Sequence, residues 1–263
     1  MIATSKTILS TSNLSIGYKS KNETFTIAND LNLNLTEGKL TTLIGGNGIG
    51  KSTLLRTLTG IQNPLKGNVY LNEKDIKNYA TLDLAQNLSV VLTEKLPPSN
   101  LTVYEIVALG RQPYTNWIGK LSKVDILKIE NAIQLTGIED FIHKKHYQIS
   151  DGQLQKVLIA RALSQDTPII VLDEPTTHLD LLHKISVFKL LKKLCEETEK
   201  SILFSTHDID LAIQLSDDMI VMMNENCIQD TPCNLIENNT FNYLFVDHNI
   251  SFDKDKGRFT FNQ

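Results

Sequence analysis

A chain of 263 residues, of which 41% are hydrophobic and 21% charged, has the composition of an ordinary globular protein with room for one large domain or two small ones. Its 30 acidic and 26 basic residues give a net charge of −4, which disfavours a nucleic-acid binder that relies on a basic surface. No apolar run approaches the roughly 18 residues needed to span a bilayer, and the N-terminus lacks the apolar core of a signal peptide. Cys195, Cys227 and Cys233 have no metal-like spacing, so we expect reduced thiols and a cytoplasmic protein.

The first part of the chain has the pattern of β-strands. Between residues 7 and 35, apolar and polar side chains alternate, which predicts antiparallel strands joined by a turn at 22–24. Glu37-Gly38 then turns the chain into the apolar run 40–44, which we expect to be a buried strand.

A glycine-rich segment follows that strand and leads into a helical pattern with Leu54, Leu55 and Leu58. It reads G-x-x-x-x-G-K-[ST] between a strand and a helix, which is the context in which this motif binds phosphate. Glycines let successive backbone N–H groups face phosphate oxygens at the positive end of a helix dipole. Lys51 can reach the β- and γ-phosphates, and the Ser52 hydroxyl can ligate Mg²⁺. A glycine turn with a chance lysine is the alternative, and we predict a nucleoside-triphosphate site instead. The predicted binding residues are Gly45, Gly46, Asn47, Gly48, Ile49, Gly50, Lys51, Ser52 and Thr53.

The middle of the chain changes from strands to helices. The phosphate-loop helix is predicted to end near Gly60, strands are predicted at 67–71 and 88–92, and Pro97-Pro98 breaks the chain. From about residue 101 to 163 the apolar periodicity is mainly helical. A helical insertion at about 97–163 inside an alternating α/β chain predicts a subdomain.

Two helices of this insertion are marked by their apolar faces. The first is predicted from Val103, Ile106, Val107 and Leu109, and the second from Leu127, Ala132, Ile133 and Leu135. Ser122 with Asp125 is typical of an N-terminal cap for the second helix.

Further on, apolar runs indicate buried strands at 168–172 and 201–206, the second of which ends at His207. Hairpins are predicted at 219–228 and, from a weaker alternation, at 250–261.

Asp173 and Glu174 end the first of these buried strands, which is where ligands collect in open α/β sheets. One acid there can hold Mg²⁺, usually through water, and a second can accept a proton from an attacking water. A solvated strand end is the alternative for the pair taken alone. With a phosphate loop in the same chain, we predict Asp173 as a metal ligand and Glu174 as a general base, because phosphoryl transfer needs a metal-holding acid.

Ser150-Asp151-Gly152-Gln153 opens a helix just upstream of this strand. With the phosphate loop and Asp173-Glu174, it resembles the signature motif of the ATP-binding cassette (ABC) ATPases, usually L-S-G-G-Q, and the resemblance covers nearly the whole chain. It implies one cassette domain over 1–263, an α/β P-loop NTPase fold with a mainly parallel RecA-like sheet, an N-terminal antiparallel β-subdomain and a helical subdomain. It also implies ATP and Mg²⁺ as cofactors.

The same resemblance implies a head-to-tail homodimer with two ATP at the interface. Ser150, Gly152 and Gln153 of one copy are then expected to close over the nucleotide on the phosphate loop of the other. The local chemistry agrees, because a serine hydroxyl and a glycine N–H at a helix N-terminus form an anion site.

Other positions match the family residue by residue. Tyr18 corresponds to the aromatic side chain that stacks on adenine, although a tyrosine ending a strand is more often a packing residue. His207 resembles the switch histidine that contacts the γ-phosphate, although a histidine at a strand end is about as often structural. Asp180 matches the aspartate of the loop that crosses the dimer interface.

Two positions depart from the family pattern. Glu94 stands where the family has a glutamine that contacts Mg²⁺, and its carboxylate is also a hard oxygen ligand but adds negative charge near the γ-phosphate. Asp151 replaces the first glycine of the signature, which suits a helix N-terminus only if the side chain points away from phosphate.

The segment 100–114, the placement of Tyr18 and the loop 177–180 resemble ATPases of iron-siderophore, haem and cobalamin importers. This implies an ATP-hydrolysing subunit at the cytoplasmic face of the membrane, bound to a separate permease and indirectly to a substrate-binding protein, with no nucleic-acid partner. The chain is too short for paired cassettes and has neither coiled-coil arms nor a fused membrane span. A soluble ABC ATPase without a transporter, for example in iron–sulfur assembly, is the main alternative. A small-molecule P-loop kinase is a weaker one, because it leaves the signature motif unexplained.

Overall fold

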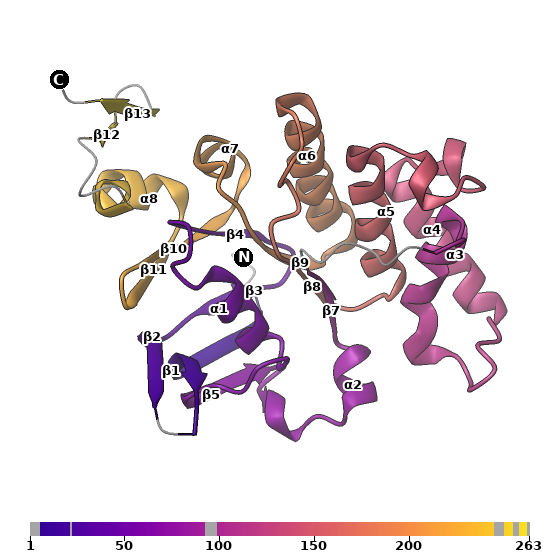
Figure 1. Ribbon diagram of the computed structural model, residues 1–263, viewed down its shortest axis with the longest axis horizontal. Coiled ribbons are helices and arrows are strands. Elements are labelled where there is room, and N and C mark those ends of the chain that lie inside the picture. Colours follow the sequence, from indigo (N-terminus) through magenta and orange to yellow (C-terminus); the bar gives the residue numbers. More distant parts are fainter. Residues whose placement is uncertain (1–5, 22, 93–98, 245–249, 255–257, 262–263) are drawn as a thin grey trace, which may run out of the picture.

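Two larger β-sheets, a two-stranded sheet near the C-terminus and several helices make up the described part of the molecule. Figure 1 shows the main sheet in the middle, with helices above it and the N-terminal sheet below. The computed structural model describes residues 6–21, 23–92, 99–244, 250–254 and 258–261. The predicted fold class, an α/β core with an N-terminal antiparallel sheet, is confirmed.

The N-terminal sheet is antiparallel, with strands in the order β2-β1-β5-β6 and β3 paired with β1. β1 and β2 are antiparallel, and between them the Ser20 N–H donates to the Glu23 carbonyl at 2.8 Å. Residue 22 of the predicted turn lies outside the described residues. The strands are β1 (Thr7–Lys19), β2 (Thr24–Leu31), β3 (Asn34–Thr36), β5 (Lys66–Leu71) and β6 (Lys74–Asp75).

The main sheet has the strand order β11-β10-β4-β9-β8-β7. Every neighbouring pair from β10 to β7 is parallel, and β11 forms an antiparallel hairpin with β10 at the edge. The mainly parallel sheet and the hairpin are therefore confirmed. The strands are β4 (Leu40–Gly45), β7 (Leu88–Val91), β8 (Ile169–Leu172), β9 (Ser201–Ser205), β10 (Asp218–Met223) and β11 (Asn226–Asp230).

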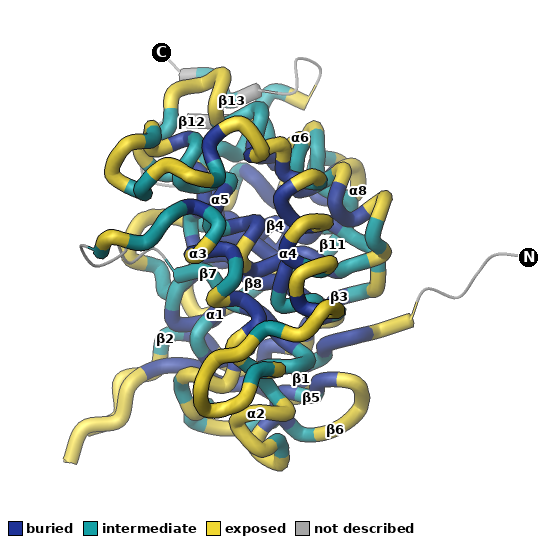
Figure 2. Tube along the Cα trace, turned by 90° about the vertical axis from the view of Figure 1, so that its right-hand side faces the viewer, coloured by how far each residue is buried: buried dark blue, intermediate teal, exposed yellow. Residues whose placement is uncertain are grey.

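Alternate residues of each main-sheet strand pack into two different cores, because successive side chains of a strand point to opposite faces. In β8, Ile170 and Leu172 join the helices on one face, whereas Ile169 and Val171 face the N-terminal sheet. Burial on both faces explains why these strands read as continuous apolar runs. Figure 2 shows this buried band through the centre of the molecule.

Helix α1 (Lys51–Leu58) lies between the two sheets. Its Leu54, Leu55 and Leu58 are buried in the same core as residues of β1, β5 and β4. The helix ends at Leu58, and Gly60 follows with φ 73°, close to the predicted end.

The helical part of the chain stands beyond β7, at one end of the main sheet (Figure 1). Its described helices are α3 (Val103–Ala108), α4 (Lys123–Thr136) and α5 (Asp151–Ser164), with short 3₁₀ helices η2 (Leu109–Tyr114), η3 (Glu139–Phe141) and η4 (His146–Gln148). The predicted cap of α4 is confirmed, since Ser122 and Asp125 form a reciprocal capping box. The predicted start near residue 97 falls in 93–98, outside the described residues.

Two apolar assignments in these helices are wrong. Leu109 is 42% exposed because α3 ends at Ala108 and a 3₁₀ turn redirects the next side chain. Leu127 is 63% exposed, whereas Ile129 and Ile133 form the buried face of α4. The buried stripe of α4 follows i, i+4 spacing from Ile129, and Leu127 lies off it.

The remaining helices lie around the two larger sheets (Figure 1). We did not predict α2, α7 or α8 from the sequence, because each is only a turn or two long. They are α2 (Thr81–Ala85), α6 (Leu181–Thr198), α7 (Ile209–Leu215), α8 (Pro232–Glu237), η1 (Ile76–Asn78) and η5 (Thr240–Leu244). The tail forms the predicted hairpin of β12 (Ile250–Asp253) and β13 (Arg258–Phe261). Among the described residues, no helix is long and apolar enough to cross a membrane.

Candidate active site

Three neighbouring parallel strands bring most of the predicted site residues to one edge of the main sheet. β4 leads into the phosphate loop, β8 into Asp173 and Glu174, and β9 toward His207. Because β4, β9 and β8 are adjacent and parallel, their carboxyl ends open at the same edge, where ligands bind in open α/β sheets.

The phosphate loop curls tightly before α1. Gly50 is the N-cap of α1 with φ 109°, and a Cβ there would lie 2.4 Å from the Ile27 side chain. A Cβ at Gly46, in contrast, would meet nothing within 4 Å. Gly50 is therefore required by the fold, whereas Gly46 borders open space in which a phosphate can approach the backbone.

Lys51 lies inside this curl. Its Nζ donates to the carbonyl oxygens of Gly45 and Gly46, both at 3.1 Å, and lies 3.4 Å from His207 Nε2. Burial lowers the pKa of Lys51, and the negative charges of Glu174 and Asp173 partly oppose that shift. The ammonium group thus stands among carbonyl oxygens and acids, all of which a γ-phosphate can replace as partners.

The acid pair is held by a serine on the neighbouring strand. Ser205, fully buried on β9, donates its hydroxyl hydrogen to Asp173 Oδ1 at 2.7 Å and accepts the Glu174 backbone N–H at 2.8 Å. One hydroxyl therefore fixes the side chain of one acid and the backbone of the next.

Both carboxylate oxygens of Glu174 have partners. The Thr177 hydroxyl donates to Oε2 at 2.9 Å, and His207 Nε2 lies 2.9 Å from Oε1. Glu174 is thereby turned toward His207, at the carboxyl edge of the main sheet.

Hydrogen bonds to Asp208 hold the segment that carries His207 in place. Asp208 accepts hydrogen bonds from Thr176 at 3.0 Å and from Lys184 at 2.7 Å. These bonds tie the segment after β9 to the loop after β8 and to α6. His207, 41% exposed at its side chain, projects from a fixed support.

Tyr18 also reaches the phosphate-loop helix. Its hydroxyl lies 2.7 Å from Thr53 Oγ1, while 52% of the residue is exposed. An exposed aromatic ring beside α1 is available to stack on a base, which is the role implied by the family resemblance.

The signature residues form a helix start of their own. Ser150 is the N-cap of α5: its hydroxyl accepts the Gln153 N–H at 3.3 Å, and its own N–H donates to Gln153 Oε1 at 3.0 Å. Asp151 is exposed at the first helical position. α5 packs on the opposite face of the main sheet from α1, so the structure does not bring Ser150, Gly152 and Gln153 to the chain's own phosphate loop.

Asp180, the N-cap of α6, accepts hydrogen bonds from His183, a residue that no motif in the sequence marks. Asp180 accepts the backbone N–H of His183 at 2.9 Å, and both its carboxylate oxygens lie 2.8 Å from His183 Nδ1. These two donors lower the pKa of Asp180.

Asp173 and Ser52 have the chemistry of magnesium ligands, because a carboxylate and a hydroxyl both offer hard oxygen atoms. Two protein ligands suffice, since Mg²⁺ usually keeps several of its waters. The described residues contain no group of three or more His, Cys, Asp or Glu that could hold a metal by itself. Glu94, the third predicted ligand, lies outside the described residues and stays a prediction.

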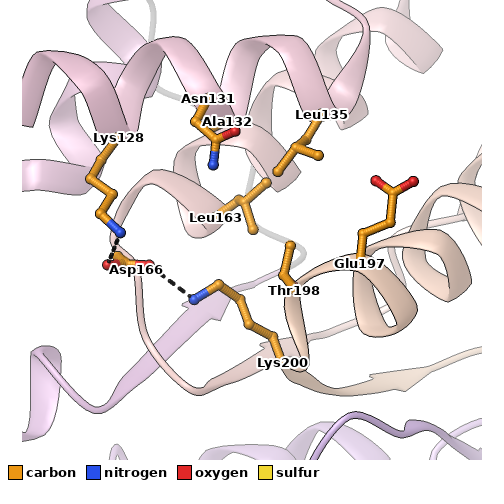
Figure 3. A pocket seen from close by; sticks show the side chains of 9 residues that line it. All are labelled: Lys128, Asn131, Ala132, Leu135, Leu163, Asp166, Glu197, Thr198 and Lys200. Carbon is orange, nitrogen blue, oxygen red and sulfur yellow. Dashed lines mark hydrogen bonds and ion pairs between the residues drawn. The ribbon is translucent and has the colours of Figure 1, made fainter.

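A cavity of about 270 Å³ elsewhere in the molecule is a poor nucleotide site. It lies between α4 and the end of α6, and Figure 3 shows Lys128 and Lys200 both turned to Asp166 within it, at 2.7 Å and 3.1 Å. Burial raises the pKa of Asp166, but bonds from the two lysines outweigh it and leave the pKa low. Asp166 therefore compensates part of the positive charge, and its two bonds join α4 to the segment that leads into β9.

Comparison with known proteins gives the family. The family model described as ABC transporter matches residues 28–177. The iron(3+)-hydroxamate import ATP-binding protein FhuC of Bacillus subtilis is 40% identical over 222 residues, which are 84% of this chain and 81% of FhuC. The achromobactin transport ATP-binding protein CbrD of Dickeya dadantii is 38% identical over 232 residues, 88% of this chain and 85% of CbrD.

Solved structures agree. CbiO1 from Clostridium perfringens, part of the ABC transporter complex cbiONQ, superposes with a TM-score of 0.77 at 30% identity, covering 92% of this chain and 95% of cbiO1. The ATP-binding cassette MJ0796, solved as a dimer bound to ADP and Pi, gives a TM-score of 0.71 at 30% identity, covering 84% and 98% of the two chains. With its phosphate loop, acid pair and signature helix, the chain belongs to the ABC transporter family, as an ATP-binding subunit that hydrolyses ATP.

Proposed function

We propose that this chain is the ATPase subunit of an importer, which couples ATP binding and hydrolysis to uptake of an iron chelate, haem or cobalamin through a separate membrane permease. The observation that carries the ATPase role is the convergence of Lys51, Glu174 and His207 at one sheet edge, with 2.9 Å between Glu174 and His207. The import role is supported by the names of the relatives, which include proteins of iron(3+)-hydroxamate and achromobactin transport.

The site works as two halves from two copies. The phosphate loop Gly45–Ser52 and Tyr18 bind the nucleotide, and Ser150, Gly152 and Gln153 of a second copy cover its γ-phosphate. A helix N-terminus favours an anion because its first N–H groups are unpaired and its dipole is positive there. α5 packs on the face of the main sheet opposite to α1 and the chain's own phosphate loop, as a head-to-tail pair requires.

Hydrolysis follows from the side chains gathered at the sheet edge. Glu174 accepts the proton of the attacking water, and Lys51 and His207 donate to the γ-phosphate oxygens. Ser52 and Asp173 would hold Mg²⁺, which when bound neutralises charge on the β- and γ-phosphates. In the structure, His207 contacts both Glu174 and Lys51. An arriving γ-phosphate replaces these contacts by bonds to His207 and Lys51. Nucleotide binding thereby frees the Glu174 carboxylate to act as a base.

The permease is the remaining partner, and it places the chain at the cytoplasmic face of the membrane. Closure of two copies on ATP moves the helical part of each against the permease, and hydrolysis resets it.

Uptake measurements in a deletion strain test the proposal. Ferric siderophore, haem and cobalamin, each labelled, are supplied to cells that lack this chain and to cells that regain it in wild-type or Glu174→Gln form. We expect uptake of one ligand to be lost on deletion and restored by the wild type alone. Normal uptake of all three, with no permease co-purifying with the tagged chain, would favour a soluble ABC ATPase instead.

A further inference from the structure

The first turn of α5 carries the signature residues, yet its polar bonds are local. Ser150 and Gln153 bond to each other in the capping box, and Ser150 and Asp151 are exposed. Gly152 is the exception, because it is buried although it belongs to this outer turn. A neighbouring element must therefore cover it.

The ring of His183 covers Gly152. A Cβ built on Gly152 would lie 2.5 Å from His183 Cδ2, 3.0 Å from Cγ and 3.2 Å from Nε2. His183 lies in the first turn of α6, so a ring from one helix start rests on the backbone of another. A side chain at position 152 would therefore displace the His183 ring, whether or not a nucleotide is bound.

Asp180 orients the His183 ring. Its Nδ1 lies 2.8 Å from both carboxylate oxygens of Asp180, and its backbone N–H donates to the same carboxylate at 2.9 Å. A carboxylate accepts only, so the Nδ1 atom carries the proton and the Nε2 edge is the one near Gly152. The ring is thus oriented by Asp180 in the way that second residues orient functional histidines.

We propose that His183 is a positioning residue for ATP-driven closure. Held by Asp180, it fixes the first turn of α5, so that the Ser150 hydroxyl and the Gly152 N–H can receive the γ-phosphate on a second copy. This inference rests on the proposed two-copy site and adds to it a link, within one subunit, from Asp180 to the signature turn. Misplacing such a turn by about 1 Å is enough to cost up to roughly 100-fold in a rate or affinity.

The test measures ATP-dependent dimer formation in a Glu174→Gln background, where hydrolysis is slowed. The ATP concentration at half-maximal dimer is read by analytical ultracentrifugation for the Glu174→Gln parent and for the parent with His183→Ala, His183→Asn or Lys189→Ala. We expect His183→Ala and His183→Asn each to raise it roughly 10- to 100-fold. Asparagine can keep a bond to Asp180 but lacks the ring edge. Lys189→Ala, an exposed change on the same helix, should match the parent.

Two controls separate positioning from folding. Binding of a fluorescent ATP analogue to the monomer's own phosphate loop and the thermal midpoint should both stay at the parent's values in His183→Ala. If they fall together with dimer formation, His183 is merely a folding residue and the proposal is wrong. An unchanged half-maximal ATP concentration in His183→Ala would also overturn it.

A double-mutant cycle addresses the contact directly. Gly152→Ala should be strongly impaired because its methyl group meets the ring, and the loss in Gly152→Ala/His183→Ala should be smaller than the product of the two single losses. Independent losses would overturn the proposed contact. If the Glu174→Gln parent itself never dimerises with ATP, both the two-copy site and the His183 proposal are wrong. If the parent dimerises and the His183 substitutions leave dimer formation unchanged, only the His183 proposal is wrong.

Discussion

Glu174 adopts a left-handed backbone conformation with φ 50°, which costs an L-residue roughly 1–2 kcal/mol. The bonds of its N–H to Ser205 and of its carboxylate to Thr177 and His207 offset that cost. Strain of this kind persists where the surroundings fix a residue, and the Glu174 carboxylate so held faces His207.

Replacement of the proposed base tests this assignment. Glu174→Gln keeps the size of the side chain and can still bond to Thr177, but an amide cannot take a proton from water. We expect ATP turnover to fall roughly 10²- to 10⁴-fold while ATP binding is retained. Steady-state phosphate release and equilibrium ATP binding measure the two effects. The exposed Glu196→Gln serves as the control, and turnover near that control would remove Glu174 from the role of base.

Alanine variants of two serines in equivalent capping boxes distinguish a loss of helix stability from a loss of nucleotide contact. Ser150 caps α5 and Ser122 caps α4, each bonding to the backbone of the third residue on. Either change to alanine should cost about 1 kcal/mol of unfolding free energy, because a capping bond is lost. Denaturant unfolding together with ATPase assays should show turnover lost in Ser150→Ala alone. Equal loss of turnover in Ser122→Ala would mean that the Ser150 hydroxyl acts through helix stability.

The residues that form continuous motifs could be predicted from the sequence, and the residues that support them could not. The glycines, Lys51 and the acid pair stand at spacings set by local chain geometry. Ser205 lies more than thirty residues from the acids it holds, and its role depends on the register of β9 against β8. His183 faces Gly152 through the packing of two helix starts, which leaves no trace in periodicity.

Among the elements, the helical part depends on a buried ion pair between η2 and α4. Arg111 Nε donates to Asp125 Oδ1 at 2.8 Å, with 5% of each side chain exposed, and Arg111 also donates to the Ser164 carbonyl at 2.8 Å. Arg111 therefore connects η2, α4 and the end of α5. Breaking such a pair leaves an uncompensated buried charge.

Arg111→Leu should accordingly lower the free energy of unfolding by about 3–5 kcal/mol. Lys193→Ala is the matched control, because it breaks the exposed Lys193–Glu197 pair of 3.7 Å, which should cost less than about 0.5 kcal/mol. Chemical denaturation of both variants gives the comparison. A loss for Arg111→Leu no larger than for the control would show that Asp125 finds other partners.

The same pair should give the protein an acid-side pH dependence. Burial raises the pKa of Asp125, but hydrogen bonds from Ser122 and Arg111 outweigh burial and leave the pKa below its usual range. A lowered folded-state pKa stabilises the protein above the unfolded pKa of about 4, and this stabilisation is lost as the pH falls through the folded value. Asp125→Asn should therefore be less stable than wild type at pH 7, with a difference that shrinks below pH ~4. A constant difference from pH 7 to pH 3 would contradict this.

Element types were predictable from long apolar runs, whereas short helices and exact faces were not. β8 and β9 are buried on both sides, so every residue carries the signal. α2, α7 and α8 are too short for an apolar period. α7 and α8 bury Ala212 and Leu235 against neighbouring elements, whereas α2 has no buried residue. Leu109 and Leu127 match a helical spacing, but the end of α3 and the rotation of α4 expose them.

At the scale of the whole molecule, the two proposed halves of the nucleotide site belong to helices on opposite faces of the main sheet. The phosphate loop, acids and His207 lie at the carboxyl edge beside α1, and the signature turn belongs to α5 on the other face. A single copy cannot bring them together without unfolding the sheet between them. Two copies in head-to-tail arrangement can, so the proposed catalysis requires dimerisation.

The most direct test is the composition of the ATP-bound species. Glu174→Gln, mixed with ATP and separated from free nucleotide, should elute as two chains holding two ATP, by light scattering and nucleotide extraction. Adding Ser150→Arg, which places a bulky cation on the signature turn, should abolish that species while each monomer still binds ATP. A single chain that retains ATP in a stable complex, unaffected by Ser150→Arg, would contradict the two-copy site.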